Sequence, residues 1–350
     1  MALVAQKELD EKVKKSLKFA TIEGGMYSVM SGLIDNFINP FAIALGAGNF
    51  AIGLIRALPP LLVAIAQPFG LRLSGFFDSR KRYIRTVVFI QAIFLLLLLS
   101  IPFLFKSNSE LMLLIFFSLF SVTTPLVIPA WTSWMADLVP ERIRGSYFGN
   151  RNMIGGIATF FAILVAGFIL SMFDEQIFLG FAIIFILGTI FRMLSFASFS
   201  KIYEPPMKYD EKRLNIFAFI REIKNNDFGI FLLYYCSLIF STSIAGFFFS
   251  VYMIRDLGLS YEAFAIIESS LALSALIANK YWGKIIDKFG NKLVLSVCGF
   301  LVPFVPLLWL TTKNPIFLLF FEIFSGFAWA GMNLAIFNYV LGYGSLKNKT

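Results

Sequence analysis

The feature that most constrains this chain is a series of long, continuously apolar runs separated by short polar connectors. A helix needs about 20 apolar residues to cross a bilayer. Ten runs of roughly that length recur, at 19–44, 50–72, 84–105, 110–135, 148–172, 177–199, 228–254, 261–281, 293–312 and 315–343. Barrel strands would alternate between apolar and polar residues, and these runs do not alternate. The sequence therefore predicts an all-α, polytopic membrane protein.

The composition agrees with this prediction and excludes several classes of protein. Hydrophobic residues make up 58% of the chain and charged residues 15%, whereas a soluble domain is near half apolar and a quarter charged. A soluble enzyme, a nucleic-acid-binding domain and a secreted disulfide scaffold are excluded. The chain has no histidine, which removes imidazole metal ligands and His-dependent relays and triads. We expect no metal, no cofactor and no catalytic residue, and we interpret Cys236 and Cys298 as core residues.

The basic residues lie mainly on one side of the predicted membrane. With the N-terminus in the cytoplasm, the inner connectors hold most of the 30 Lys and Arg residues, and the outer connectors hold only Lys106, Arg255 and Lys313. Cytoplasmic connectors of membrane proteins carry this excess of Lys and Arg. The chain is thus predicted to lie in the cell membrane with its N-terminus cytoplasmic. The net charge of +9 then faces anionic lipid headgroups and not nucleic acid.

The sequence divides into two halves that resemble each other. We expect a cytoplasmic tail at 1–18, a six-helix bundle at 19–199, a cytoplasmic linker at 200–227 and a second bundle at 228–350. The run at 50–72 ends in Ser-Gly-Phe-Phe-Asp-Ser-Arg-Lys-Arg, and the run at 261–281 leads into Gly-Lys-Ile-Ile-Asp-Lys-Phe-Gly-Asn-Lys. Duplicated six-helix halves are typical of transporters.

Three connector motifs make the chain resemble the major facilitator superfamily of secondary transporters. That family carries G-x-x-x-D-x-x-G-x-[RK] once in each half. The second copy here fits it, with Gly283, Asp287, Gly290 and Lys292, whereas the first copy keeps only Asp78 and its basic run. The segment 137–149 resembles the family's D-x-x-P-x-x-x-R-G-x-x-x-G motif. The family has twelve helices in two bundles of six. The sequence has ten, so we expect a chain truncated before the last two.

The resemblance implies that these connectors act as gates. In the family, the Asp of each loop faces the start of a helix in the other bundle, which would place Asp287 near 145–149. The alternative is a set of surface turns whose basic residues fix topology alone. The expected gating residues are Asp78, Arg80, Lys81, Arg82, Asp137, Arg144, Gly145, Gly283, Asp287, Gly290 and Lys292.

Ionisable residues inside the apolar runs are candidates for substrate binding or coupling, because a charge within a bilayer is costly. Asp35 and Arg56 come from adjacent runs at comparable depth, so they can pair, either structurally or as a pair that a proton or an anionic substrate opens. Arg192 is interpreted as a snorkelling anchor. Trp131 and Trp134 share a helix face and either stack on substrate or face lipid. The expected substrate or coupling residues are Asp35, Asn36, Asn39, Arg56, Trp131, Trp134, Glu268 and Glu322.

These observations predict a monomeric transporter that moves a small solute by alternating access, either coupled to protons as a symporter or as a uniporter. An integral membrane enzyme is the alternative from another class, but it would need clustered Asp or a His base, and this chain has neither. A non-transporting receptor on a transporter-like bundle is the third hypothesis.

Overall fold

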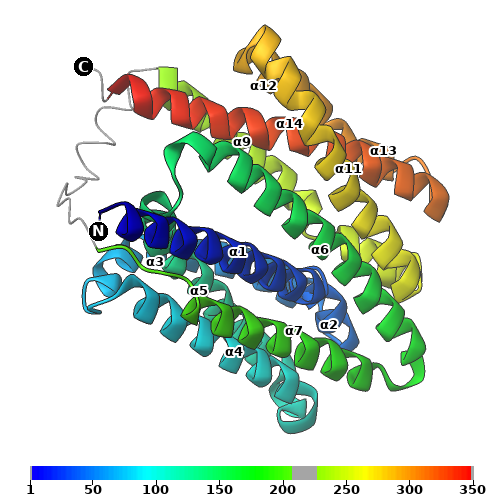
Figure 1. The fold of residues 1–350 in the computed structure, drawn as a ribbon. Helices are drawn as coiled ribbons and strands as arrows, with labels where there is room; N and C mark the ends of the chain where they lie inside the picture. The colour runs from blue at the N-terminus through cyan, green and yellow to red at the C-terminus, as the bar shows by residue number, and fades with distance from the viewer. Residues whose placement is uncertain (1, 207–226, 348–350) are drawn as a thin grey trace. The chain divides into compact units, whose positions relative to one another are not determined.

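The computed structural model describes residues 2–206 and 227–347, and within them the side chains of 11–67, 69–70, 73–206 and 227–340. Every regular element in these ranges is helical (Figure 1). This confirms the predicted all-α fold class. Most of the predicted linker, 200–227, lies outside the described residues.

The chain forms two compact units. The first unit is Met1–Pro205 together with Ser250–Ser269, and the second is Pro206–Phe249 together with Ser270–Thr350. The segment Ser250–Ser269 falls within the predicted second bundle, 228–350, but its contacts lie with the first unit.

The part of the first unit that precedes the linker contains seven α-helices joined by short turns. They are α1 (Ala2–Ile34), α2 (Ile38–Ala44), α3 (Asn49–Ser74), α4 (Arg80–Leu104), α5 (Ser109–Leu138), α6 (Arg144–Met172) and α7 (Ile177–Ser200), with 3-10 turns η1 (Lys106–Asn108), η2 (Glu141–Ile143) and η3 (Asp174–Gln176). Helix α3 packs on α5, α1 packs on α6 and α7, and α4 packs on α5 and α7. Because α1 begins at Ala2, the described part of the predicted tail is a helical extension of the first run.

The remaining helices follow the linker. They are α9 (Asp227–Gly246), α10 (Phe249–Val251), the π-helical turn η4 (Tyr252–Asp256), α11 (Tyr261–Phe289), α12 (Asn291–Leu301), α13 (Phe304–Trp309) and α14 (Pro315–Lys347). Helices α12 and α13 pack on α14. Trp282, Cys298 and Met332 lie in the core of this unit.

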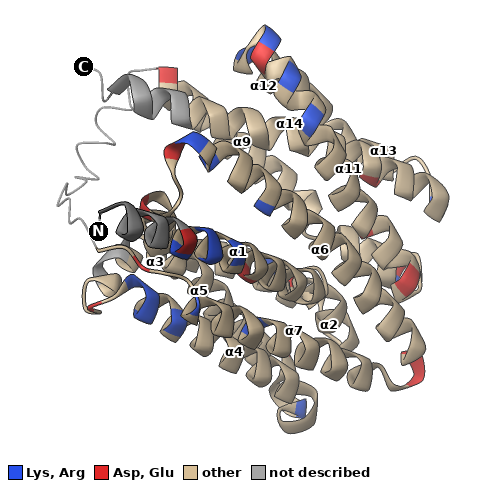
Figure 2. Ribbon diagram, in the orientation of Figure 1, with Lys and Arg blue, Asp and Glu red and all other residues tan. Residues whose placement is uncertain are grey.

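Each of the ten predicted apolar runs is helical, and three of them are interrupted: 19–44, 228–254 between α9 and α10, and 293–312 between α12 and α13. The first run, 19–44, is divided between α1 and α2 at Asp35–Phe37. Pro40 has no N–H to donate to the carbonyl of Asn36, so the helical hydrogen-bond ladder cannot continue there. Among the described residues, nine helical stretches are long and apolar enough to cross a membrane, and the run at 19–44 is not one of them. Figure 2 shows the charged residues mainly near helix ends, with long uncharged stretches between them.

Candidate functional site

Inside the first unit, four helices surround a cavity of about 210 Å³. Its lining residues come from α1, α5, α6 and α7, and we call it the arginine cavity. They are Glu23, Tyr27, Thr124, Val127, Ile128, Trp131, Arg151, Arg192 and Phe199. The cavity therefore combines two guanidinium groups, one carboxylate and flat aromatic rings.

An ion pair across the cavity fixes Arg151. Its Nη2 lies 3.1 Å from Oε2 of Glu23, and its Nε donates to the carbonyl of Ala20 at 3.2 Å. Its guanidinium also lies 4.6 Å from the ring centroid of Trp131. Gly24 makes room for this arrangement, because a Cβ there would lie 2.6 Å from the guanidinium carbon of Arg151. Helix α1 thus presents Glu23 and a small neighbour to the same side chain.

Arg192 is held less completely than Arg151. Its Nη1 donates to Oγ of Ser195 at 3.1 Å, and that hydroxyl donates to Oε1 of Glu23 at 3.1 Å. Its guanidinium lies 5.1 Å from the ring centroid of Tyr27. The side chain is 4% exposed, and its Nε has no hydrogen-bond partner among the described residues. A buried donor without a partner is costly, and the guanidinium that carries this donor lines the cavity.

The prediction that Arg192 snorkels to the membrane surface is wrong, because the side chain is buried and bonded to its own helix and to Tyr27. Arg151 follows an inner connector in the sequence, where a basic residue is expected for topology alone, yet it binds Glu23. The sequence feature shared by Arg151 and Arg192 is that each is a charged residue within or beside an apolar run. The sequence does not show that three such residues on three different helices point at one another.

A second polar cluster lies where α1 ends, and it brings together four residues of the first unit. Nε of Arg56 donates to Oδ1 of Asn39 at 2.6 Å, and Nη2 of Arg56 donates to the carbonyl of Asp35 at 3.3 Å. Nδ2 of Asn39 donates to Oγ of Ser250 at 2.7 Å. Arg56 and Asp35 are therefore neighbours, but within the described part of the chain they form no ion pair, because Arg56 contacts the backbone of Asp35.

The carboxylate of Asp35 has its own partner. Oδ2 of Asp35 accepts a hydrogen bond from Oγ of Ser31 at 2.5 Å. Arg56 interacts electrostatically with both Asp35 and Glu268, and Asp35 interacts with Arg192 as well. Both carboxylates are half-buried.

The charged groups of the two polar clusters form a series of alternating sign. Glu23, Arg192, Asp35, Arg56 and Glu268 each interact electrostatically with the next residue in that order. Together with Arg151, the series contains three arginines and three carboxylates, so its formal charge is zero.

The other expected substrate or coupling residues have different surroundings. Trp131 lines the arginine cavity, whereas Trp134 is fully buried, stacks on Phe199 and donates its indole N–H to the carbonyl of Tyr203 at 3.0 Å. Asn36 lies half-buried in the break between α1 and α2. Glu322 is buried on α14 in the second unit.

The first and third connector motifs meet at one buried arginine. Arg80 is 3% exposed, and its Nη1 lies 2.7 Å from Oδ2 of Asp137 and 3.0 Å from Oγ of Ser133. Its Nη2 donates to the carbonyl of Pro205 at 3.1 Å. Arg80 thus joins the start of α4 to the end of α5 and to the chain beyond α7.

The neighbouring motif residues are held more loosely or point elsewhere. Asp78 and Arg82 form an exposed pair at 3.5 Å. Nζ of Lys81 donates to the carbonyls of Ser200 and Ile202, where α7 ends. Nη2 of Arg144 donates to the carbonyl of Ala136 at 3.0 Å.

The second copy of the loop motif forms the turn between α11 and α12. Gly290 has φ +83°, a conformation that favours glycine, and its N–H bonds the carbonyl of Ile286 at 2.8 Å. Asp287 and Lys292 are exposed beside it. Gly145 and Gly283 have open space where a Cβ would lie. The contact predicted between Asp287 and residues 145–149 would join the two units and stays a prediction.

This architecture matches a family profile and several solved structures. The profile of the Major Facilitator Superfamily matches residues 24–345. Similar solved structures include a mutant form of the nucleoside transporter NupG, with a TM-score of 0.70, 15% identity, and coverage of 91% of this chain and 81% of that chain. A D-xylose–proton symporter gives a TM-score of 0.66 at 15% identity, covering 91% and 80%.

A bacterial homologue of the human lysosomal transporter Spinster, in an inward-facing and occupied conformation, gives a TM-score of 0.65 at 16% identity, covering 91% and 72%. At these identities the likeness shows the fold alone. No curated protein matches the chain.

Proposed function

Because the chain belongs to the Major Facilitator Superfamily and is a multi-pass membrane transporter, we propose that it moves a small organic monoanion together with one proton by alternating access. The similar structures are named for nucleosides and for D-xylose with protons. One fold therefore serves chemically different solutes. The choice of solute in this chain rests on its own cavity, and the two arginines beside one carboxylate in its lining carry the proposal.

The local charge of the arginine cavity favours an anion. Among the lining residues, Arg151 and Arg192 carry two positive charges and Glu23 carries one negative charge, so the lining itself has one excess positive charge. A guanidinium binds a carboxylate through parallel hydrogen bonds, and such charge-assisted bonds are stronger than neutral ones. The rings of Tyr27 and Trp131 already stack on the two arginines. A compact carboxylate that presents a flat or ring-shaped body would use both features.

The balanced charge series provides the argument for the proton. A bound monoanion would leave the six ionisable groups with one excess negative charge, which is costly within a membrane. One proton restores neutrality. Asp35 is the group best placed to take it, because its carboxylate is bonded to the hydroxyl of Ser31 and would break no ion pair on protonation.

Alternating access needs parts of the molecule to separate in turn. At the outer ends of the predicted helices, Ser250 binds Asn39, and Arg255 donates to Oδ1 of Asn49 and to the carbonyl of Ala47, each at 2.6 Å. We propose that these contacts open when solute exchanges with the outside, and that the connector motifs act as the gate on the inner side. The proposal includes a cell-membrane location, a cytoplasmic N-terminus, as the distribution of basic residues predicts, and a monomeric protein.

Uptake by the purified chain in proteoliposomes tests the proposal. We would measure labelled lactate and D-glucuronate beside their uncharged counterparts lactamide and D-glucose. An alkaline interior should drive accumulation of an acid, a membrane potential alone should not, and the uncharged solutes should be excluded. Equal uptake of acid and uncharged counterpart, or uptake driven by potential alone, would contradict it.

Substitutions of Arg192 test whether the transported solute binds in the arginine cavity. Arg192→Gln should reduce acid uptake at least tenfold, because the guanidinium donors are lost, and Arg192→Lys should restore part of it. Lys106→Gln, at the exposed turn between α4 and α5, removes the same charge outside the cavity and should leave uptake unchanged. Normal acid uptake in Arg192→Gln would show that the solute binds elsewhere.

A further inference from the structure

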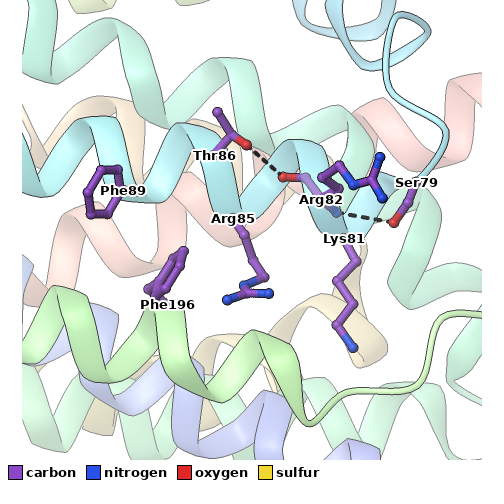
Figure 3. Close-up of a pocket in the computed structure, with 7 residues that line it drawn as sticks. All are labelled: Ser79, Lys81, Arg82, Arg85, Thr86, Phe89 and Phe196. Carbon is purple, nitrogen blue, oxygen red and sulfur yellow. Dashed lines mark hydrogen bonds between the residues drawn. The ribbon is translucent and has the colours of Figure 1, made fainter.

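A separate pocket of about 520 Å³ lies where α4 begins, beside α7. We call it the basic pocket, and it shares no lining residue with the arginine cavity. Figure 3 shows Lys81 and Arg85 pointing from α4 toward α7. The lining residues are Ser79, Lys81, Arg82, Arg85, Thr86, Phe89 and Phe196. Three of them are cationic and none is acidic.

The acidic residues near the pocket already have partners. Asp78 pairs with Arg82, Asp137 pairs with Arg80, and Glu204 accepts from the hydroxyl of Ser79. Ser79 caps α4 by accepting from the N–H of Arg82 (Figure 3). Among the described residues, Arg82 is thus the one pocket cation with a carboxylate in salt-bridge distance, and that pair is exposed.

Among these cations, Arg85 gives the strongest indication of a bound anion. Its guanidinium lies 4.4 Å from the ring centroid of Phe196, and its Nε is buried without a hydrogen-bond partner among the described residues. Arg82 is 68% exposed and bound only loosely to Asp78. Two guanidinium groups thus have donors to offer to an oxyanion at the pocket.

The pocket continues into an apolar stripe along α4. Phe89 is 46% exposed, and it is followed by Ile93 at 42% and Leu96 at 46%. These residues are spaced by four and three positions, so they lie on one face of the helix over a rise of about 10 Å. Helix α4 is one of the helices long and apolar enough to cross a membrane. Its basic end would lie at the headgroup level and its apolar stripe in the hydrocarbon.

Lys81 also connects the basic pocket with a second basic hollow. That hollow has a volume of about 450 Å³ and is lined by Lys12, Lys15, Lys81 and Lys201 together with Ser16, Phe19 and other residues near the end of α7. The cationic rim therefore extends from α4 past α7 to α1.

We propose that the basic pocket binds the headgroup of an anionic phospholipid. Arg82 and Arg85 hold the phosphate, and an acyl chain follows Phe89, Ile93 and Leu96 along α4. Basic pockets between membrane helices bind anionic headgroups, and the adjoining apolar stripe distinguishes a lipid from a free phosphate. The basic pocket shares no lining residue with the arginine cavity, so lipid binding there can be measured without the transported solute.

Native mass spectrometry of the purified chain tests this site by titration with phosphatidylglycerol or phosphatidylcholine. We expect phosphatidylglycerol to bind at least tenfold more tightly. In Arg82→Gln/Arg85→Gln its affinity should fall roughly 25-fold, since each Lys or Arg near a phosphate is worth about fivefold. Arg82→Lys/Arg85→Lys keeps both charges and should recover most of the affinity. Lys106→Gln, at the other end of α4, should bind like the unchanged chain.

Competition separates a lipid from its headgroup. Glycerol 3-phosphate at millimolar concentration should fail to displace bound phosphatidylglycerol, because it cannot cover the apolar stripe. Displacement at lipid-like concentrations would show a small phosphate site and overturn the proposal. Equal binding of the two lipids, or unaltered phosphatidylglycerol binding in a folded glutamine variant, would overturn it as well. Thermal unfolding of each variant establishes that it is folded.

Discussion

At the scale of single residues, Arg80 is the residue whose substitution should reduce the free energy of unfolding most. It is buried against Asp137 and bonds Ser133 and the carbonyl of Pro205. Arg80→Ala leaves these acceptors without a donor, and removal of one partner of a buried pair is strongly destabilising. Because Asp137 is partly exposed, we expect a loss of about 2 kcal/mol in the free energy of unfolding, measured by chemical unfolding in detergent.

Arg82→Ala is the matched control for that experiment. It removes the same charge two positions away, but Arg82 and Asp78 are both exposed. Exposed pairs contribute little, so the change should be within about 0.5 kcal/mol. Equal losses in the two variants would mean that burial of Arg80 does not matter to stability.

Asp35 is the residue whose substitution should separate solute movement from proton movement. Asp35→Asn keeps a partner for Ser31 but cannot release a proton. We expect exchange of labelled for unlabelled acid to persist, within about threefold, while accumulation driven by a pH gradient is lost. Lys106→Gln, at the exposed turn between α4 and α5, removes a charge outside both polar clusters and should keep full pH-driven accumulation. Full pH-driven accumulation in Asp35→Asn would assign coupling to another group.

The sequence identifies individual charged residues well and their partners poorly. Asp35 and Arg56 lie in adjacent runs at similar depth, which predicts that they can pair, and the structure brings them together through the backbone carbonyl of Asp35 and not through its carboxylate. Glu23, Arg151 and Arg192 come from three helices that are far apart in sequence. Their meeting depends on how each helix is rotated about its axis, and the apolar periodicity is too weak to fix that rotation when lipid and protein are both apolar.

At the scale of helices, apolar run length correctly predicted that each of the ten runs is helical, because twenty apolar residues in a bilayer have few alternatives to a helix. It did not predict the break at Asp35–Phe37, since the run remains apolar on both sides of it. Pro40 was the only local signal. The polar cluster around Arg56 depends on this break, because the free carbonyl of Asp35 is one of its acceptors.

Helix packing in the first unit depends on small residues at close approaches. A Cβ on Gly70 of α3 would lie 2.8 Å from the carbonyl oxygen of Leu126 on α5. We expect Gly70→Ala to push these helices apart and to cost about 1–3 kcal/mol of stability, seen as a lower midpoint of thermal unfolding. Gly145→Ala, where nothing lies within 4 Å, should be neutral or slightly stabilising. A neutral Gly70→Ala would mean that α3 and α5 do not need this approach.

At the scale of the whole molecule, the division of the chain differs between sequence and structure. The repeat places 250–269 in the second half, whereas the contacts of Ser250–Ser269 lie with the first unit. Composition cannot show this, because the contacts involve a few side chains at helix ends, such as Asn39 and Ser250. Alternating access requires such a segment to change partners, so its assignment depends on the state of the transporter.

A reversible cross-link tests that requirement. In a chain with both native cysteines replaced by serine, Asn39→Cys/Ser250→Cys joined by a short thiol linker should abolish uptake, and a linker cleavable by reductant should restore it. Ser79→Cys/Glu204→Cys, also a hydrogen-bonded pair in the first unit, should cross-link without loss of uptake. Uptake by the cross-linked Asn39/Ser250 protein would show that transport does not require Ser250–Ser269 to separate from Asn39.

The π-helical turn at Tyr252–Asp256 gives the segment Ser250–Ser269 one residue more than a regular α-helical turn would have. Contraction of such a turn to ordinary helix shifts the register by one position and swings everything beyond it by about 100°. Arg255, which lies in this turn, would then sweep away from Ala47 and Asn49. The five residues of this turn would thus hold the outer segment against Ala47 and Asn49 in one register and release it in the other. The change needs neither a hinge nor unfolding of the helix.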